Sequence, residues 1–194
     1  MTQNNRRIEV SEAAWRVIVR EGLDRTSMRA IAQEMNCTTG VVTHYFRNKQ
    51  ELIVFALHQV TARLQVRMEQ AIANLSGLER LVTMLSVFLP RDREGQEILM
   101  VWVAFLGYAV GRQGLMDEHR QSASMLRQIV VTELNGLQKE GLIRPDIAPE
   151  TEANVLLAIG NGVSLDYLIQ AQRLSPEQQQ AAIESYVKSL QMSR

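Results

Sequence analysis

Apolar residues recur every three or four positions along most of this chain, a spacing that is typical of amphipathic helices. The pattern stops at residues that end helices, among them Gly22, Asn36, Pro90 and Gly141. Ser175 followed by Pro176 marks the start of a last helix. We therefore expect an all-α chain with helices at about 5–21, 28–35, 39–46, 49–75, 77–89, 93–110, 115–140, 149–172 and from 176 onward.

Two short helices joined by a tight turn are predicted within residues 26–49. Thr26 and Ser27 can cap the first helix, and Asn36 tolerates the left-handed backbone that ends it. In the second helix Val42 and Phe46 form an apolar face one turn apart. Its opposite face carries small or hydrogen-bonding residues suited to base edges, namely Thr39, Gly40, Thr43 and His44. This arrangement matches the DNA-binding helix-turn-helix.

A third helix follows the motif at once, with Asn48 as its cap and Glu51 at the capping-box position. It runs to about residue 75, long enough to connect two parts of the molecule rigidly. In the first helix of the chain, Trp15 is expected in the core.

The string Thr26…Ile31-Ala32…Gly40…Tyr45-Phe46-Arg47-Asn48-Lys49…Leu52 resembles the N-terminal DNA-binding domain of the TetR/AcrR regulators, from about residue 6 to 55.

That resemblance implies a three-helix DNA-binding domain at 1–49 and a helical bundle for effector binding and dimerisation at 50–194. It also implies the residue roles. Base contacts fall to Thr39, Gly40, Thr43 and His44, and phosphate contacts to Thr26, Ser27, Thr38, Tyr45 and Lys49. Family members often have an aromatic residue where this chain has Thr43, so the operator sequence does not follow from the resemblance.

Two segments of the bundle are expected to join a second copy of the chain. Residues 122–138 carry an apolar stripe at three- and four-residue steps, and residues 150–172 are apolar nearly all round. Burial of the second segment within a monomer is the alternative on pattern alone. The resemblance favours a homodimer, whose paired recognition helices would meet successive major grooves of an inverted repeat about 34–36 Å apart.

An aromatic and methionine-rich segment around residues 100–108 is the candidate effector site. Trp102, Phe105 and Tyr108 belong to it, and possible neighbours are Met84, Phe88, Met116, His119 and Tyr167. A plain hydrophobic core is at least as good an interpretation of each residue. The Trp-Val-Ala-Phe string and Ile159-Gly160-Asn161-Gly162 are similar to the choline-responsive branch of the family, but Leu106 and Ser164 depart from it. We therefore expect an unidentified small organic effector.

The formal net charge is zero, but the charged residues are unevenly distributed along the chain. Residues 1–49 hold eight Lys/Arg against five Asp/Glu, and residues 50–194 hold thirteen against sixteen. A basic head agrees with DNA binding. The single cysteine, Cys37, fits a reducing cytoplasm. The arginines near the start argue against a signal peptide, and the longest apolar run, residues 98–110, is too short to span a membrane.

An enzyme is the competing class, and the sequence disfavours it. The histidines at 44, 58 and 119 are far apart, and no nucleophile, phosphate loop or carboxylate pair stands out. Asp117-Glu118-His119 could hold a metal, but a solvated helix start is the better interpretation. We expect no catalytic residues, cofactor or metal. The prediction is a homodimeric one-component regulator, most simply a repressor; control by a partner protein or a corepressor is the alternative.

Overall fold

The structure is a computed structural model that describes residues 3–171 and 173–192. Helices account for most of these residues. They are α1 (Gln3–Glu21), α2 (Met28–Glu34), α3 (Thr39–Tyr45), α4 (Lys49–Ile72), α5 (Gly77–Ser86), α6 (Arg93–Ala109), α7 (Gln113–Lys139), α8 (Pro149–Ile169) and α9 (Pro176–Ser189). The all-α class is confirmed. The eighth helix was predicted to end at residue 172, which lies outside the described residues; α8 ends at Ile169.

The predicted helix ends have the expected backbone geometry. Gly22, Asn36 and Gly141 adopt left-handed φ angles of +78°, +51° and +72°. Ser27 caps α2 by accepting the amide N–H of Ala30 at 3.1 Å. Ser175 forms the complete capping box of α9 with Gln178. Short-range chemistry therefore fixes these boundaries.

Two predicted caps differ from the structure in detail. Thr38 is the N-cap of α3, but its hydroxyl makes no capping hydrogen bond. Asn48 accepts the Glu51 N–H at 2.9 Å, as predicted. The Glu51 carboxylate does not return to Asn48 and instead accepts the N–H of Arg47 at 3.0 Å. The capping box of α4 is thus only half formed, and its acidic residue holds the turn after α3.

The chain divides into two compact units, residues 1–63 with 97–120 and residues 64–96 with 121–194. The helices α4, α6 and α7 each contribute residues to both units. The helix α4 is 24 residues long, about 36 Å. It is unbroken over these residues. The predicted boundary between residues 49 and 50 separates a DNA-binding domain from an effector-binding and dimerisation domain, and this functional division stays a prediction.

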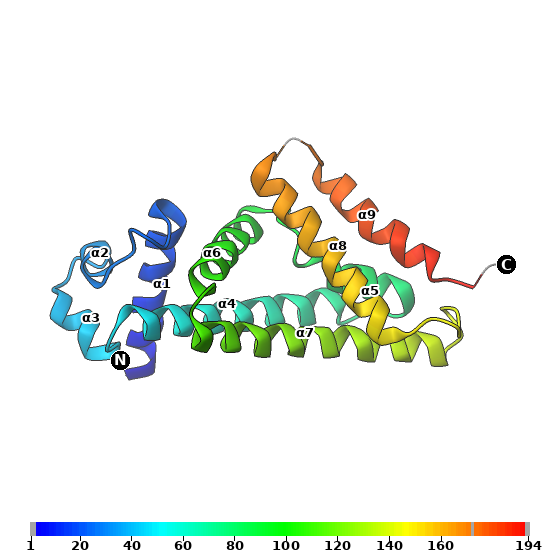
Figure 1. The fold of residues 1–194 in the computed structure, drawn as a ribbon, viewed down its shortest axis with the longest axis horizontal. Helices are drawn as coiled ribbons and strands as arrows, with labels where there is room; N and C mark the ends of the chain where they lie inside the picture. The colour runs from blue at the N-terminus through cyan, green and yellow to red at the C-terminus, as the bar shows by residue number, and fades with distance from the viewer. Residues whose placement is uncertain (1–2, 172, 193–194) are drawn as a thin grey trace. The chain divides into compact units, whose positions relative to one another are not determined.

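The first unit has a core formed by α1, α2, α3 and the start of α4 (Figure 1). The fully buried residues of α1 that face it are Val10, Ala13 and Val17. This stripe places Trp15 at its edge, half-buried, where the indole Nε1 donates to Glu97 Oε2 at 3.3 Å. The expectation that Trp15 belongs to the core was therefore wrong. The side of α1 that is fully buried is the one that carries Val10, Ala13 and Val17.

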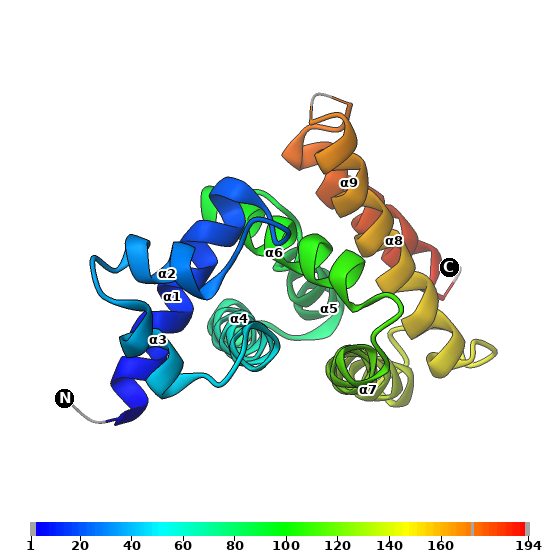
Figure 2. The same ribbon diagram turned by 60° about the vertical axis from the view of Figure 1, so that its left-hand side comes forward.

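The second unit has a larger core to which α4, α5, α7, α8 and α9 all contribute. The helices α8 and α9 lie side by side in both views (Figures 1 and 2) and pack against α5. Ala153 and Leu156 of α8 and Ile183 of α9 are completely buried in this core. Tyr186 of α9 donates to the Glu152 carboxylate of α8 at 2.7 Å. A hydrogen bond thus reinforces the apolar contact between the last two helices.

Candidate DNA-binding and effector sites

The helix α3 is attached to the first unit through one face. Val42 and Phe46 have no exposed surface, as predicted. The four residues predicted for base contact, Thr39, Gly40, Thr43 and His44, are all exposed. Because two buried side chains on one side hold this short helix, its small and polar residues are all directed to solvent.

The exposed face of α3 offers acceptors, donors and open backbone. The Thr43 hydroxyl donates to the carbonyls of Thr39 and Gly40 at 3.2 and 3.3 Å, so its oxygen remains an acceptor on the outside. The His44 ring lies edge-on to Tyr45, with ring centroids 4.9 Å apart. A Cβ built on Gly40 would meet only Thr38 Oγ1, at 3.7 Å. Packing within the protein therefore does not require glycine at position 40.

The residues predicted to contact phosphate have different environments. Ser27 and Thr38 are exposed beside helix N-termini, and Tyr45 is half-buried. Thr26 is only 2% exposed, and its hydroxyl donates to the Gly22 carbonyl at 2.9 Å. A buried hydroxyl with its donor engaged is not available to a phosphate. We therefore leave Thr26 out of the DNA-contact set and assign it to the turn between α1 and α2.

Lys49 lies at the first position of α4 and is half-buried. Its ammonium donates to the Leu23 carbonyl at 2.5 Å and lies 5.3 Å from the centre of the Tyr108 ring. Burial, together with the charge of Arg112, lowers the pKa of Lys49, and Asp24 acts in the opposite direction. The side chain is thus held in place by the protein and is not a free surface lysine.

Two arginines beside α3 were missed by the sequence reasoning. Arg47 follows α3 directly, and its side chain is 90% exposed. Arg7 of α1 places its guanidinium over the rings of Phe46 and Phe55, 4.7 and 4.8 Å from their centres, and donates to Glu51 at 3.2 Å. This contact ties α1 to the turn after α3. No local pattern marks it, because the partners are about 40 positions apart.

Three of the residues predicted for the effector site come together in the first unit. His119 of α7 lies against Trp102 and Phe105 of α6, with ring centroids 6.1 and 6.3 Å apart. Phe105 is buried, whereas Trp102 and His119 are half-buried. Burial lowers the pKa of His119 below its ordinary value, which favours a neutral imidazole near pH 7. The cluster is therefore aromatic, and its one titratable side chain has a lowered pKa.

The remaining residues of that prediction lie elsewhere. Met84 is 1% exposed in the core of the second unit, and Phe88 packs against the same core. Met84 is therefore a core residue, and we leave it out of the effector set. Tyr167 is a half-buried residue of α8. The ring of Tyr108 is in contact with the cations of Lys49 and Arg112.

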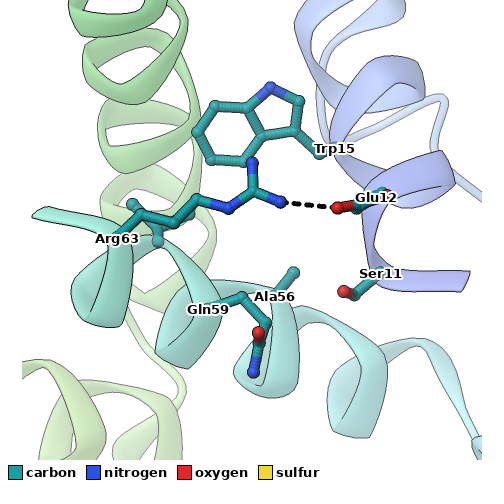
Figure 3. A pocket seen from close by; sticks show the side chains of 7 residues that line it. Ser11, Glu12, Trp15, Ala56, Gln59 and Arg63 are labelled. Carbon is teal, nitrogen blue, oxygen red and sulfur yellow. Dashed lines mark hydrogen bonds and ion pairs between the residues drawn. The ribbon is translucent and has the colours of Figure 1, made fainter. Parts of the chain in front are cut away.

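One small cavity lies between α1 and α4 in the first unit (Figure 3). Its volume of about 10 Å³ leaves room for a single water molecule. Figure 3 shows the Arg63 side chain reaching past the Trp15 ring to pair with Glu12, at 2.7 Å. A cavity of about 270 Å³ in the second unit is lined by residues of α5 and α7, including the paired Arg80 and Glu133. Neither cavity contains any residue predicted for the effector.

The structure does not support a metal site at residues 117–119. Asp117 pairs with Arg120 at 2.7 Å, Glu118 contacts His58 at 3.0 Å, and His119 packs against aromatic rings. Within the described residues no group of three or more His, Cys, Asp or Glu is placed to hold a metal ion. The described helices also include none with the length and apolar character needed to cross a membrane.

Comparisons with known proteins agree with this architecture. Residues 11–54 match the family described as bacterial regulatory proteins, tetR family. Residues 77–191 match the family described as BetI-type transcriptional repressor, C-terminal. The HTH-type transcriptional regulator PksA of Bacillus subtilis is 28% identical over 187 residues, 95% of this chain and 89% of the relative. The HTH-type transcriptional regulator BetI of Vibrio vulnificus is 23% identical over 70% of each chain.

Solved structures show the same fold. A putative transcriptional regulator from Pseudomonas aeruginosa is 25% identical, with a TM-score of 0.82 over 98% of this chain and 92% of that one. A putative regulator from Saccharomonospora viridis, solved in complex with choline, has a TM-score of 0.90 at 20% identity over 98% and 100% of the two chains. These relatives are regulators and not enzymes, and two family descriptions cover both parts of the chain. The chain therefore belongs to the TetR family of transcriptional regulators and carries a BetI-type repressor domain at its C-terminus.

Proposed function

We propose that this regulator is a homodimeric one-component repressor that binds an inverted-repeat operator and is released by a small organic effector. The main support for DNA binding is the burial pattern of α3. Its apolar residues Val42 and Phe46 are fully buried, while Thr39, Gly40, Thr43 and His44 are exposed. Such residues can hydrogen-bond to base edges in the major groove or let the backbone approach closely. Binding to chromosomal DNA would place the protein in the cytoplasm.

Phosphate contacts in this proposal come from residues around α3. Ser27, Thr38, Tyr45 and Lys49 were predicted from the sequence, and the exposed Arg47 joins them on structural grounds. Contacts of this kind fix the protein on the duplex but carry no sequence information. Loss of a base contact should therefore change the DNA sequence preference, whereas loss of a phosphate contact should weaken binding to all sequences alike.

Exposed apolar residues on α7 and α8 support the homodimer. Met125 and Ile129 of α7 are 54% and 38% exposed. On α8, Leu165, Leu168 and Ile169 are exposed, the last of them 81%. Apolar residues clustered on an exposed helix face are typical of protein interfaces. A two-fold dimer would place two copies of α3 about 34–36 Å apart, one turn of the DNA helix.

The effector part of the proposal rests on the cluster of Trp102, Phe105 and His119, with Phe88 and Tyr167 as further candidates. Aromatic faces attract an organic cation, and choline is bound in one structural relative. An effector acts only if it binds the released form more tightly than the DNA-bound form; a tenfold loss of DNA affinity requires about 1.4 kcal/mol of differential binding. A change in the tilt of α4 would then alter the spacing of the two α3 helices.

The test is selection of random duplex DNA by the purified protein at near-physiological salt. An enriched inverted repeat supports the proposal, and lack of enrichment contradicts it. Binding that appears only with an added corepressor supports the alternative of a regulator controlled by a corepressor. The enriched duplex is then titrated with choline and with other small organic cations. Release of the DNA by a small molecule supports the proposal of a small organic effector. Release only by a cell protein supports the alternative of a regulator controlled by a partner protein.

A further inference from the structure

The ring of Tyr108, at the end of α6, is shared by two positive charges. The Lys49 ammonium lies 5.3 Å from its centre, and the Arg112 guanidinium carbon lies 3.9 Å from it. Both cations belong to the first unit, but they come from distant parts of the sequence. Each contact is within the range in which a ring attracts a cation. Tyr108 thus brings together the start of α4 and the turn between α6 and α7.

Neighbouring groups hold both cations in place. The Lys49 ammonium donates to the Leu23 carbonyl, which restricts the otherwise flexible side chain. Arg112 follows Gly111, whose φ of +78° ends α6, and its guanidinium donates to the Tyr108 carbonyl. Arg112 is exposed, so its other N–H groups are available to a ligand. Both side chains are therefore fixed, and the Arg112 guanidinium remains exposed to solvent.

This arrangement brings two positive charges to one ring. Burial is the main cause of the lowered pKa of Lys49, and the charge of Arg112 lowers it further. The carboxylate of Asp24 acts in the opposite direction and more strongly than Arg112 does. A phosphate group would neutralise both charges, and its oxygens match the N–H groups of an arginine and an ammonium.

We propose that Tyr108 is a positioning residue for DNA binding, which holds Lys49 and Arg112 together as a paired phosphate-binding site. Lys49 alone was expected to contact phosphate; the proposal adds Arg112 as the second cation and gives Tyr108 a role outside the effector site. It rests on the proposed function, since it requires that the first unit binds DNA.

The experiment measures the salt dependence of binding to the selected operator and to an unrelated duplex. The slope of log affinity against log salt counts the phosphate charges that the protein neutralises. Four proteins are compared: the unchanged chain, Arg112→Gln, Tyr108→Leu and Tyr108→Phe. Arg120→Gln is the matched control, because Arg120 is an exposed arginine of the same unit that pairs with Asp117.

We expect Arg112→Gln to reduce the slope by about one charge on both duplexes, and Tyr108→Leu to weaken binding roughly fivefold with a reduced slope. Tyr108→Phe keeps the ring and should bind like the unchanged chain, as should Arg120→Gln. An unchanged slope in Arg112→Gln would overturn the paired site; this exposed substitution is not expected to unfold the protein. Failure of the unchanged chain to bind any duplex would instead overturn the proposed function.

A second measurement separates positioning from a loss of stability. In isotope-labelled protein, the pKa of Lys49 should rise when DNA binds, because a nearby phosphate favours the charged ammonium. Adding Tyr108→Leu to the variant that already carries Lys49→Ala and Arg112→Gln should then cost little further affinity, because both cations that the ring positions are absent. A further loss of DNA affinity in this triple variant equal to that of Tyr108→Leu alone would contradict a positioning role for Tyr108.

Discussion

The helices α3 and α8 both bury one face and expose another, but the exposed faces differ in chemistry. On α3 the exposed residues are small or hydrogen-bonding, such as Thr43 and His44. On α8 they include Leu165, Leu168 and Ile169. Polar groups of this size suit the edges of bases, whereas apolar side chains gain free energy only when another apolar surface covers them. The comparison shows how the exposed face of a helix indicates the class of partner.

The two helices also differ in how strongly they are held. The helix α3 has seven residues and only one buried side chain within its bounds, Val42, with Phe46 just after it. The helix α8 has 21 residues and packs on α5 and α9. A short helix is marginal without tertiary contacts. The DNA-reading surface should therefore be the more easily disrupted of the two.

The largest expected effect is that of Phe46→Ala. Removal of a fully buried phenyl ring costs about 3–5 kcal/mol, and here it also removes the Arg7 and Phe55 contacts. We expect loss of DNA binding and of the ordered first unit, measured by hydrogen exchange of its amides. The second unit should remain protected. Equal loss of protection in both units would show that α3 is not the weakly held part.

The charged substitution Ile169→Asp tests the exposed face of α8. Because this side chain is 81% exposed, the change should leave the folded monomer intact while weakening the dimer at least tenfold, measured by sedimentation equilibrium. The control is Val66→Asp, which places the same charge at a 52% exposed position of α4. A dimer of unchanged strength in Ile169→Asp would move the interface away from this face.

Lys49→Ala tests a phosphate contact beside α3. We expect affinity to fall by a similar factor for all DNA sequences, with the salt slope reduced by about one charge. Fluorescence anisotropy at several salt concentrations measures both quantities. A loss confined to the selected operator would instead indicate that Lys49 contributes to sequence reading.

The smallest effect concerns the hydrogen bond that joins α8 to α9. The Glu152 carboxylate accepts the Tyr186 hydroxyl and raises the pKa of Tyr186 to about 12. The bond stabilises the protonated phenol, so its contribution is complete below pH 10 and is lost as the pH rises through about 12. Tyr186→Phe should lower the free energy of unfolding by about 1 kcal/mol near pH 7.

Urea unfolding across this pH range measures that difference. The gap between the unchanged chain and Tyr186→Phe should be constant up to pH 10 and then narrow. Glu152→Gln is the companion variant, because it removes the charge of the acceptor. A difference in unfolding free energy that does not depend on pH would show that the hydrogen bond from Tyr186 to Glu152 does not stabilise the protein.

The sequence predicted the fold well because its helix ends depend on local chemistry. Gly22, Asn36 and Gly141 end helices through their own backbone preferences, and Ser175 caps α9 with Gln178, three positions away. The apolar pair Val42 and Phe46 follows from the helical period alone. Features fixed within about one turn of helix are thus readable without a structure.

Contacts between distant segments were the part that could not be predicted. The Arg7 contact with Phe46 and the Lys49 contact with Tyr108 depend on how the helices pack. For the same reason Trp15 was predicted in the core although it is half-buried, and Thr26 was predicted to contact phosphate although it is buried. Met84 and Trp102 are both large apolar side chains, and only their packing distinguishes a core residue from a candidate ligand contact.

The most direct test of the account is DNA selection by the unchanged chain and by His44→Ala in parallel. If the exposed face of α3 reads base edges, both proteins should enrich the same inverted repeat, and the variant should lose preference at one position in each half-site. Half-site centres should lie about one helical turn apart. Enrichment of an identical sequence with no relaxed position, or of a site without two-fold symmetry, would contradict the account.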